Sequence, residues 1–283
     1  MINTSILRQE MRELTLKELQ DISLEILLDV HQFCEKNNIK YSLGYGTLLG
    51  AVRHQGWIPW DDDIDILMTR PEWEKFSRLY QSSKGYQLMT TQNPDSYMVY
   101  PRVYETAKTI SKSPAPYAKQ QMGVWIDIFI VDGIPDNTSS YNKKVLSKIK
   151  SLYKSSLYFR KKLALMDYKG WKGFVVRHFH PLIKRWIRLC KKKIDLLCLK
   201  YQFSKSRFCA CPHCPEALEK GCIRKWATKD FEKYIYIPFE GQQLMIAAGY
   251  KNILQSIYGD YMKLPPKEER VRKHSLHRFY KIQ

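Results

Sequence analysis

Residues 59–67 read PWDDDIDIL and place four aspartates within five positions at the start of an apolar segment. Successive side chains of a β-strand point to opposite faces, so Asp63 and Asp65 should share one face while Ile64 enters the core. Two carboxylates on one face can bind a hard divalent cation such as Mg²⁺ or Mn²⁺, which also offsets their repulsion. The alternative is a solvated acidic turn that binds nothing.

A second apolar segment, expected to form a strand over residues 123–131, carries a single aspartate in its middle. A lone charge inside such a strand is costly unless it is paired or coordinates a metal ion. Asp127 is therefore predicted to be the third metal ligand. The alternative is a buried ion pair between Asp127 and an arginine or lysine.

Gly46 and Thr47 lie between a short strand expected at residues 39–43 and a short helix that ends at His54. Backbone N–H groups at a helix start attract phosphate, and a threonine hydroxyl adds a donor. Strand, Gly-Thr, helix, Asp-Ile-Asp and a later strand aspartate form the pattern of the nucleotidyltransferase fold. The sequence thus predicts an α+β protein with a mixed β-sheet core flanked by helices, and metal-assisted chemistry at a phosphate.

The 283 residues are 44% hydrophobic, which is enough for one large domain or two small ones with a sizeable core. The N-terminal residues lack the basic-then-apolar pattern of a signal peptide, and no run approaches the roughly 18 apolar residues of a membrane span. We therefore expect a cytoplasmic protein. The odd number of cysteines, seven, favours reduced thiols over a disulfide framework.

The net charge of +19 is concentrated in residues 141–208, which hold 20 of the 47 basic residues and only two acidic ones. The segment has a helical pattern that Pro181 and residues 170–173 are expected to interrupt. Its basic residues are mixed with aromatic ones as in an interfacial amphipathic helix, cationic on one side and apolar on the other, which predicts peripheral association with the anionic inner face of the membrane. A solvated helical face is one alternative; nucleic acid is a less favoured partner because no recognised motif accompanies the charge.

Residues 209–222 read CACPHCPEALEKGC. Cys209, Cys211, Cys214 and Cys222 can form a structural zinc site, although their spacing differs from that of a standard zinc finger. The alternative is a loop of reduced cysteines without a metal.

The longest specific pattern is YSLGYGTLLGAVRHQGWIPWDDDIDI at residues 41–66, which closely resembles the core motif of the LicD family. The resemblance continues in WIDIF at 125–129, DGIP at 132–135, FEG at 239–241 and YGDYMKLPP at 258–266. It covers roughly residues 20–135 and 226–275. It implies transfer of a phospho-alcohol, typically phosphocholine from CDP-choline, to a sugar hydroxyl with release of CMP. The implied acceptor is a lipid-linked glycan of the teichoic acid or lipopolysaccharide type.

By position, the resemblance implies that Asp63, Asp65 and Asp127 bind the metal ion. Asp61 and Asp62 match acidic residues that orient a metal-bound water or accept the proton of the attacking hydroxyl.

The resemblance also implies a set of residues that contact the donor phosphates: Gly46, Thr47, Arg53, His54 and Arg102. For Arg53 and His54 the alternative is a structural salt bridge to one of the four aspartates.

Three segments are predicted: a catalytic core at 1–138, a basic helical insertion with the cysteine-rich loop at 139–225, and a C-terminal segment at 226–283 that packs on the core. The last should contain a helix at 242–258. Two other functions stay open, namely transfer of a nucleotidyl group to a sugar or protein, and a non-catalytic role in membrane or nucleic-acid binding. The complete aspartate motif argues against the second.

Overall fold

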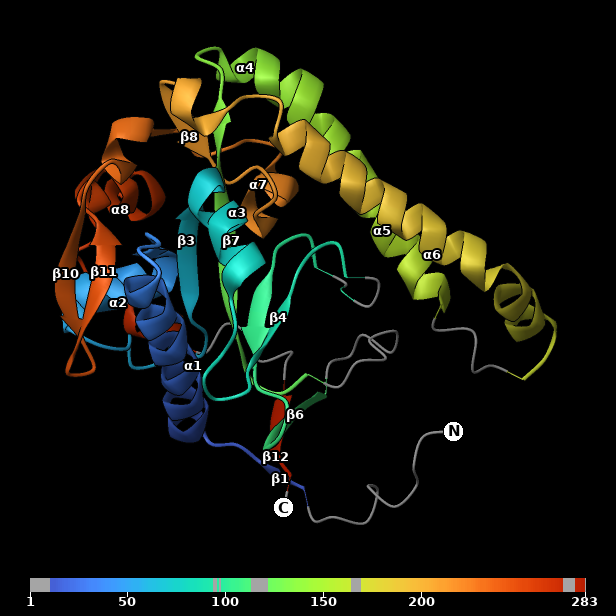
Figure 1. Ribbon diagram of the computed structural model, residues 1–283, viewed down its shortest axis with the longest axis horizontal. Helices are drawn as coiled ribbons and strands as arrows, with labels where there is room; N and C mark the ends of the chain where they lie inside the picture. Colours follow the sequence, from blue (N-terminus) through green and yellow to red (C-terminus); the bar gives the residue numbers. More distant parts are fainter. Residues whose placement is uncertain are drawn as a thin grey trace.

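The computed structural model describes residues 11–93, 96, 98–112, 122–163, 169–271 and 278–282. Its centre is a mixed β-sheet flanked by helices, so the α+β nucleotidyltransferase-like fold is confirmed (Figure 1). The main path of the sheet runs β2-β3-β7-β5-β4. These strands are β2 (Ser42–Leu43), β3 (Asp65–Thr69), β7 (Trp125–Ile134), β5 (Arg102–Tyr104) and β4 (Gln87–Met89).

The long strand β7 is buried along its whole length, which explains its nearly continuous apolar sequence. Its first half lies parallel to β3, with Asp127 beside Asp65 in register, and antiparallel to β5. Its second half pairs with β8 (Phe208–Ala210), which in turn pairs with β9 (Trp226–Ala227). The β3–β7 register therefore brings together two aspartates that are 62 positions apart in the chain.

Helices α1 (Leu16–Lys36) and α3 (Arg70–Leu79) pack together against the sheet. Phe33 of α1 makes edge contacts with the rings of Phe76 and Tyr80 in the α3 region. A reciprocal capping box between Thr15 and Glu18 fixes the start of α1. Helix α2 (Tyr45–His54) lies between β2 and β3 in the chain and leads to the aspartate cluster.

The C-terminal segment departs from the helix expected over residues 242–258. Residues 242–247 form a strand, β11 (Gln242–Ala247), paired with β10 (Tyr234–Phe239), and α8 (Tyr250–Tyr258) follows. Glu240 and Gly241 both have positive φ angles, 50° and 74°, and they join the two strands in a tight hairpin. The short apolar run was compatible with helix or strand, and pairing with β10 decides for the strand.

A small sheet of β1 (Arg12–Glu13), β12 (Arg278–Lys281) and β6 (Thr109–Lys112) brings both ends of the described chain together. The remaining short elements are α4 (Thr138–Tyr141), the π-helical η2 (Asn142–Leu146), α7 (Pro215–Lys220), and the 3₁₀ turns η4 (Phe203–Lys205), η5 (Thr228–Phe231) and η6 (Lys267–Glu269).

The basic segment forms a long helical hairpin of α5 (Ser147–Leu163) and α6 (Trp171–Cys198), which extends away from the central sheet (Figure 1). The expected interruption at residues 170–173 agrees with the start of α6, whose N-cap Gly170 has φ 118°. The expected break at Pro181 is wrong, because α6 continues through it. One proline removes a single backbone donor, and packing of α6 along α5 holds the remaining turns in place.

Buried polar contacts fasten the base of α6 to the core. Arg70 binds both carboxylate oxygens of Asp132 at 2.6 and 2.8 Å and reaches Asp195 of α6 at 2.9 Å. The Lys191 ammonium donates to the backbone carbonyls of Asn93 and Ser96 at 3.0 and 2.9 Å. The C-terminal end of α6 is therefore bonded to the core at two points. We call the hairpin of α5 and α6 the arm, and this end its base.

Close to this base, Asp132, Cys198 and His213 bring potential metal-ligand atoms within 4.8 Å of one another. Arg70 already engages both oxygens of Asp132, and His213 accepts the backbone N–H of Ile130 at 3.3 Å. A guanidinium beside the carboxylate repels a cation. We therefore interpret this cluster as part of the attachment of the arm.

Among the helices of the described residues, none combines the length and the apolar character that crossing a bilayer requires.

Candidate active site

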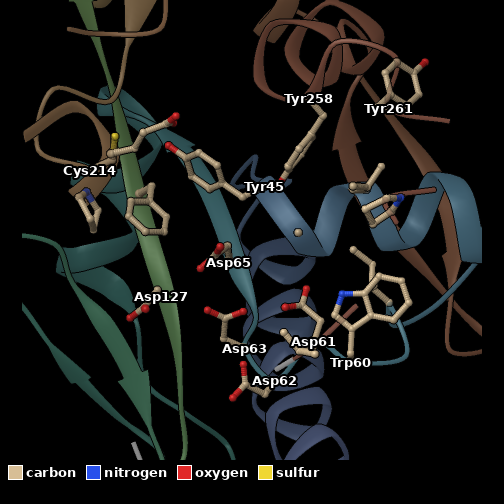
Figure 2. Close-up of a pocket in the computed structure, with 18 of the residues that line it drawn as sticks. Tyr45, Trp60, Asp61, Asp62, Asp63, Asp65, Asp127, Cys214, Tyr258 and Tyr261 are labelled. Carbon is tan, nitrogen blue, oxygen red and sulfur yellow. The ribbon is translucent and has the colours of Figure 1, made fainter. Parts of the chain in front are cut away.

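A cleft of about 900 Å³ opens over the carboxylates at the start of β3. Figure 2 shows that Asp63, Asp65 and Asp127 face a common hollow, with Asp61 beside them and Tyr45 above. The other side of the cleft carries Trp60, Tyr258 and Tyr261 (Figure 2). Eight of the ten predicted site residues line it: Gly46, Arg53, Asp61, Asp62, Asp63, Asp65, Arg102 and Asp127.

The aspartates occupy a loop and the first residue of a strand. Strand β3 begins at Asp65, so Asp63, which was expected to share a strand face with Asp65, lies in the preceding loop. The buried Gln20 side chain of α1 donates to the backbone carbonyl of Asp61 at 2.9 Å and holds this loop. Asp61, Asp62 and Asp63 each offer a carboxylate oxygen, and the three oxygens lie within 4.8 Å of one another.

The ionisation of Asp65 is opposed by the other aspartates of this group. Burial, followed by the charges of Asp63, Asp127 and Asp61, raises the pKa of Asp65 well above its usual value. So many oxygen donors in one buried place suit a hard divalent cation, which would relieve the repulsion between them. The donor set therefore fits Mg²⁺ or Mn²⁺.

Asp127 pairs with Arg102, its neighbour on β5. The Nε and Nη2 atoms of Arg102 lie 2.5 and 3.4 Å from the two carboxylate oxygens of Asp127, and both side chains are buried. The guanidinium also stacks on Trp125, 4.1 Å from the ring centre. The structure thus shows the ion pair that was the alternative for Asp127, and it gives Arg102 a partner within the protein.

Gly46 leaves room for the aspartate loop because it has no side chain. A Cβ atom at this position would lie 2.5 Å from Oδ2 of Asp61, closer than side-chain carbons come to other atoms. The absence of a side chain at position 46 therefore lets the Asp61 carboxylate approach the first turn of α2.

We expect Gly46→Ala to lower the rate of the phosphate chemistry predicted for this cleft about 10- to 100-fold, because the new methyl group displaces the Asp61 carboxylate by a distance that catalytic geometry does not tolerate. The melting temperature should change little, since alanine favours the helix. Steady-state rates and thermal unfolding measure the two effects. The control is Ser77→Ala, on an exposed part of α3. A second glycine, Gly85, is not used because its φ of 83° would place the new alanine in a strained backbone conformation. Wild-type activity in Gly46→Ala would contradict this account.

Thr47 lies outside the cleft lining, so its predicted contact with a phosphate stays a prediction that the arrangement does not favour. It is buried and does not line the cleft, and its hydroxyl accepts the backbone N–H of Asp65 at 2.9 Å. Thr47 therefore joins α2 to the start of β3. Neighbouring residues of a helix point in different directions, so Gly46 faces the cleft while Thr47 points into the protein.

His54 also lies outside the cleft lining, and Arg53 makes contacts that the sequence did not suggest. Burial and the neighbouring Arg53 lower the pKa of His54, so its neutral ring accepts the Nε–H of Arg53 at 3.0 Å. Arg53 also donates to the backbone carbonyls of Tyr261 and Lys263, at 3.0 and 3.3 Å. Within the described residues the contacts of Arg53 are therefore with His54 and the C-terminal segment, and not the salt bridge to one of the four aspartates that was the alternative. Arg53 thus holds the C-terminal segment over the cleft.

That C-terminal segment supplies cleft residues that were not predicted, among them Tyr258, Tyr261 and Lys263. Partial burial and the charge of Asp65 raise the pKa of the Tyr258 hydroxyl, which stays protonated and able to donate a hydrogen bond, although the side chain is 41% exposed. The family motif at residues 258–266 contains these residues. It lies far from the aspartates in sequence, so the sequence did not indicate that the two segments line the same cleft.

Glu240, from the FEG motif, braces the other end of the aspartate loop. Its carboxylate accepts the backbone N–H of Trp57 at 3.1 Å, and its own N–H donates to the carbonyl of Gln55 at 3.0 Å. The motif therefore positions the chain between α2 and the aspartates.

The four cysteines of the suggested zinc site are free thiols spread over several elements. Within the described residues they do not form a group with ligand atoms within 4.8 Å of one another. Cys214 caps α7 by accepting the N–H of Ala217, and Cys222 lies against Asn142. The thiols of Cys211 and Cys214 both contact the Tyr45 hydroxyl. Zinc at this cluster stays a prediction that the arrangement does not favour.

The mixed sheet with an acidic cleft at the start of β3 defines a nucleotidyltransferase-fold protein. A family model described as "LicD/FKTN/FKRP, nucleotidyltransferase domain" matches residues 38–190, which include much of the helical hairpin. The chain is 31% identical to the lipopolysaccharide cholinephosphotransferase LicD of Haemophilus influenzae, over 93% of this chain and 97% of that protein. This chain therefore belongs to the LicD family, and the expected enzyme class, a phosphotransferase, is confirmed.

Two rickettsial proteins are similar over shorter segments. An uncharacterised protein of Rickettsia typhi is 41% identical over 29% of this chain, and one of Rickettsia prowazekii is 62% identical over 15%. Because both are uncharacterised, they do not indicate a function for this chain.

Proposed function

We propose that this protein transfers phosphocholine from CDP-choline to a sugar hydroxyl of a cell-surface glycan in a reaction that depends on Mg²⁺ or Mn²⁺. The observation that carries the proposal is the cluster of carboxylates below an aromatic cleft, in a chain that matches a lipopolysaccharide cholinephosphotransferase over 93% of its length. That relative favours lipopolysaccharide over teichoic acid as the class of acceptor.

Asp63 and Asp65 remain the best pair to hold the metal ion, with Asp61 adjacent to them. Asp127 adjoins Asp65 but shares its charge with Arg102, so it is a weaker candidate for the third ligand. A bound divalent cation would neutralise charge on the donor phosphates during transfer.

In the proposed reaction, the acceptor hydroxyl oxygen forms a bond to the phosphorus of phosphocholine, and the bond from that phosphorus to the CMP oxygen breaks. The hydroxyl proton passes to a carboxylate in the cleft, Asp61 or Asp62. Both line the cleft, and we favour Asp61 because it is the more accessible of the two, whereas Asp62 is buried. Proton acceptance by a positioned carboxylate and alignment of the hydroxyl are what the protein contributes here.

Lys263 is the better candidate for direct contact with the donor phosphates. It lines the cleft and is exposed, whereas Thr47 and His54 are turned away from it. Arg102 lies deeper in the cleft and is held by Asp127. An exposed ammonium at the rim can follow a phosphate as it enters and leaves.

The aromatic lining suits the quaternary ammonium of choline, which binds to ring faces. Arg102 already stacks on Trp125. We therefore place the choline group on the opposite side of the cleft, where Trp60, Tyr258 and Tyr261 lie (Figure 2).

The reaction is tested by incubating the protein with CDP-choline, Mg²⁺ and a dephosphocholinated lipopolysaccharide, and by identifying the nucleotide released. We expect CMP, phosphocholine on the glycan, and loss of both products when EDTA replaces Mg²⁺. CDP-ethanolamine and CDP-glycerol serve as matched donors that test selection for choline. Release of pyrophosphate from CTP, without CMP from any CDP-alcohol, would instead indicate nucleotidyl transfer.

A further inference from the structure

The arm formed by α5 and α6 presents a surface that the proposed reaction does not use. The base of α6 is fastened through Lys191 and Asp195, and α6 packs along α5. The buried residues in the first two-thirds of α6 include Val176 and Ile187 and lie on one side of the helix.

On another side, α6 exposes large apolar side chains. Trp171 is 73% exposed, Phe174 66% and Leu182 60%, and Leu189 and Leu196 are exposed as well. Their positions recur at intervals close to whole helical turns, so they lie in one stripe along the helix. Apolar stripes of this length are uncommon on the surface of a monomeric protein and usually mark an interaction surface.

Basic residues run beside this stripe. Arg185, Arg188 and Lys192 are exposed, lie within three residues of Trp186 or Leu189, and follow one flank of the stripe. The 68 residues from 141 to 208 contain only two acidic residues, and one of them, Asp195, is bound to Arg70. The surface therefore joins apolar side chains to a strongly positive flank.

We propose that this face of α6, from Trp171 to Leu196, docks on an anionic lipid bilayer. An amphipathic helix binds in the interface plane, with its apolar face at the boundary of the acyl chains and its basic residues at the headgroups. The charge selects anionic lipid, and the exposed tryptophan and phenylalanine side chains suit the interfacial region. A partner protein helix would cover the apolar stripe but would not require the excess of positive charge.

The docking is tested by flotation of the full-length protein with vesicles. Binding to mixed phosphatidylcholine–phosphatidylglycerol vesicles should be strong and should weaken with salt, and binding to pure phosphatidylcholine should be weak. Replacing Arg185, Arg188 and Lys192 with glutamine should weaken binding on the order of 100-fold, since each basic residue near the surface contributes about fivefold. The matched control replaces three exposed lysines of the core, Lys36, Lys84 and Lys251, with glutamine, and should bind as the wild type does.

A second variant removes the apolar stripe by replacing Trp171, Phe174, Leu182 and Leu189 with alanine. These side chains are exposed, so the fold should remain intact by circular dichroism, while vesicle binding should be lost. Brominated lipids should quench tryptophan emission of the wild type, and Trp171→Phe should keep binding but lose part of the quenching.

Three results would overturn the proposal. The first is equal binding of wild type and stripe variant to anionic vesicles. The second is duplex DNA or RNA binding that depends on the three basic residues while vesicles do not bind. The third is a dimer in solution that the stripe variant converts to a monomer, with no vesicle binding by either form. None of these tests depends on the transfer reaction.

Discussion

Asp65→Asn should abolish CMP release, with a loss of at least about 1,000-fold in turnover at saturating Mg²⁺. The carboxylate stands between Asp63, Asp127 and Asp61, and its replacement by an amide removes the central negative ligand of the proposed cation site. The measurement is the initial rate of CMP formation from CDP-choline, together with metal affinity by calorimetry.

The same variant should be more stable than the wild type when metal is absent. A carboxyl whose pKa is raised by folding stabilises the protein while it is protonated, and this stabilisation is lost as pH rises from about 4 through the folded-state pKa. At neutral pH in EDTA, Asp65→Asn should therefore raise the melting temperature by about 2–4 °C, as about 1 kcal/mol does in a domain of this size. Mg²⁺ should stabilise the wild type and remove the difference.

The matched control is Asp136→Asn, an exposed aspartate in the loop after β7, which should leave rate and stability unchanged. Full activity of Asp65→Asn would show that the metal assignment is wrong. An inactive variant with unchanged metal affinity would indicate that Asp65 contributes to the reaction in another way than by binding the metal ion.

The second large effect is expected at the Arg102–Asp127 pair. Arg102→Leu leaves the Asp127 carboxylate buried without its guanidinium partner, and breaking a buried ion pair in this way costs about 3–5 kcal/mol. We expect a decrease in melting temperature of about 6–20 °C at neutral pH. Thermal unfolding in EDTA, where no metal can replace the missing charge, measures this directly.

The double variant Arg102→Leu/Asp127→Asn separates the two roles of Arg102. If Arg102 chiefly neutralises Asp127, the second substitution should restore most of the lost stability. A variant Arg102→Leu with wild-type stability and a raised KM for CDP-choline would instead make Arg102 a donor phosphate ligand, as the family resemblance implied.

The sequence contained enough local information for most of the core. The apolar segment that follows the acidic motif and the apolar segment around Asp127 each specify a strand through contacts between near neighbours. These patterns led to the correct fold class and to the correct family. Where the pattern was short and apolar, as at residues 242–247, helix and strand were equally compatible, and the partner strand β10 decided.

The site was only partly accessible in this way. The sequence indicated which aspartates gather, because strands β3 and β7 are easily recognised and run parallel. It did not reveal that Thr47 faces Asp65, that Arg53 holds the C-terminal segment, or that Tyr258 and Lys263 line the cleft. Each of these depends on the direction of a side chain or on a contact between distant segments.

By itself, then, the sequence determined most elements of the core, the acidic motif and the excess of positive charge in residues 141–208, because composition and periodicity act over a few neighbouring residues. Only the tertiary structure showed that Arg102 pairs with Asp127 and that the Asp61 carboxylate occupies the space beside Gly46. It also showed that large apolar side chains are exposed beside the basic flank of α6. The physical reason is that pairing, burial and exposure are properties of the packed chain, and residues far apart in sequence determine them together.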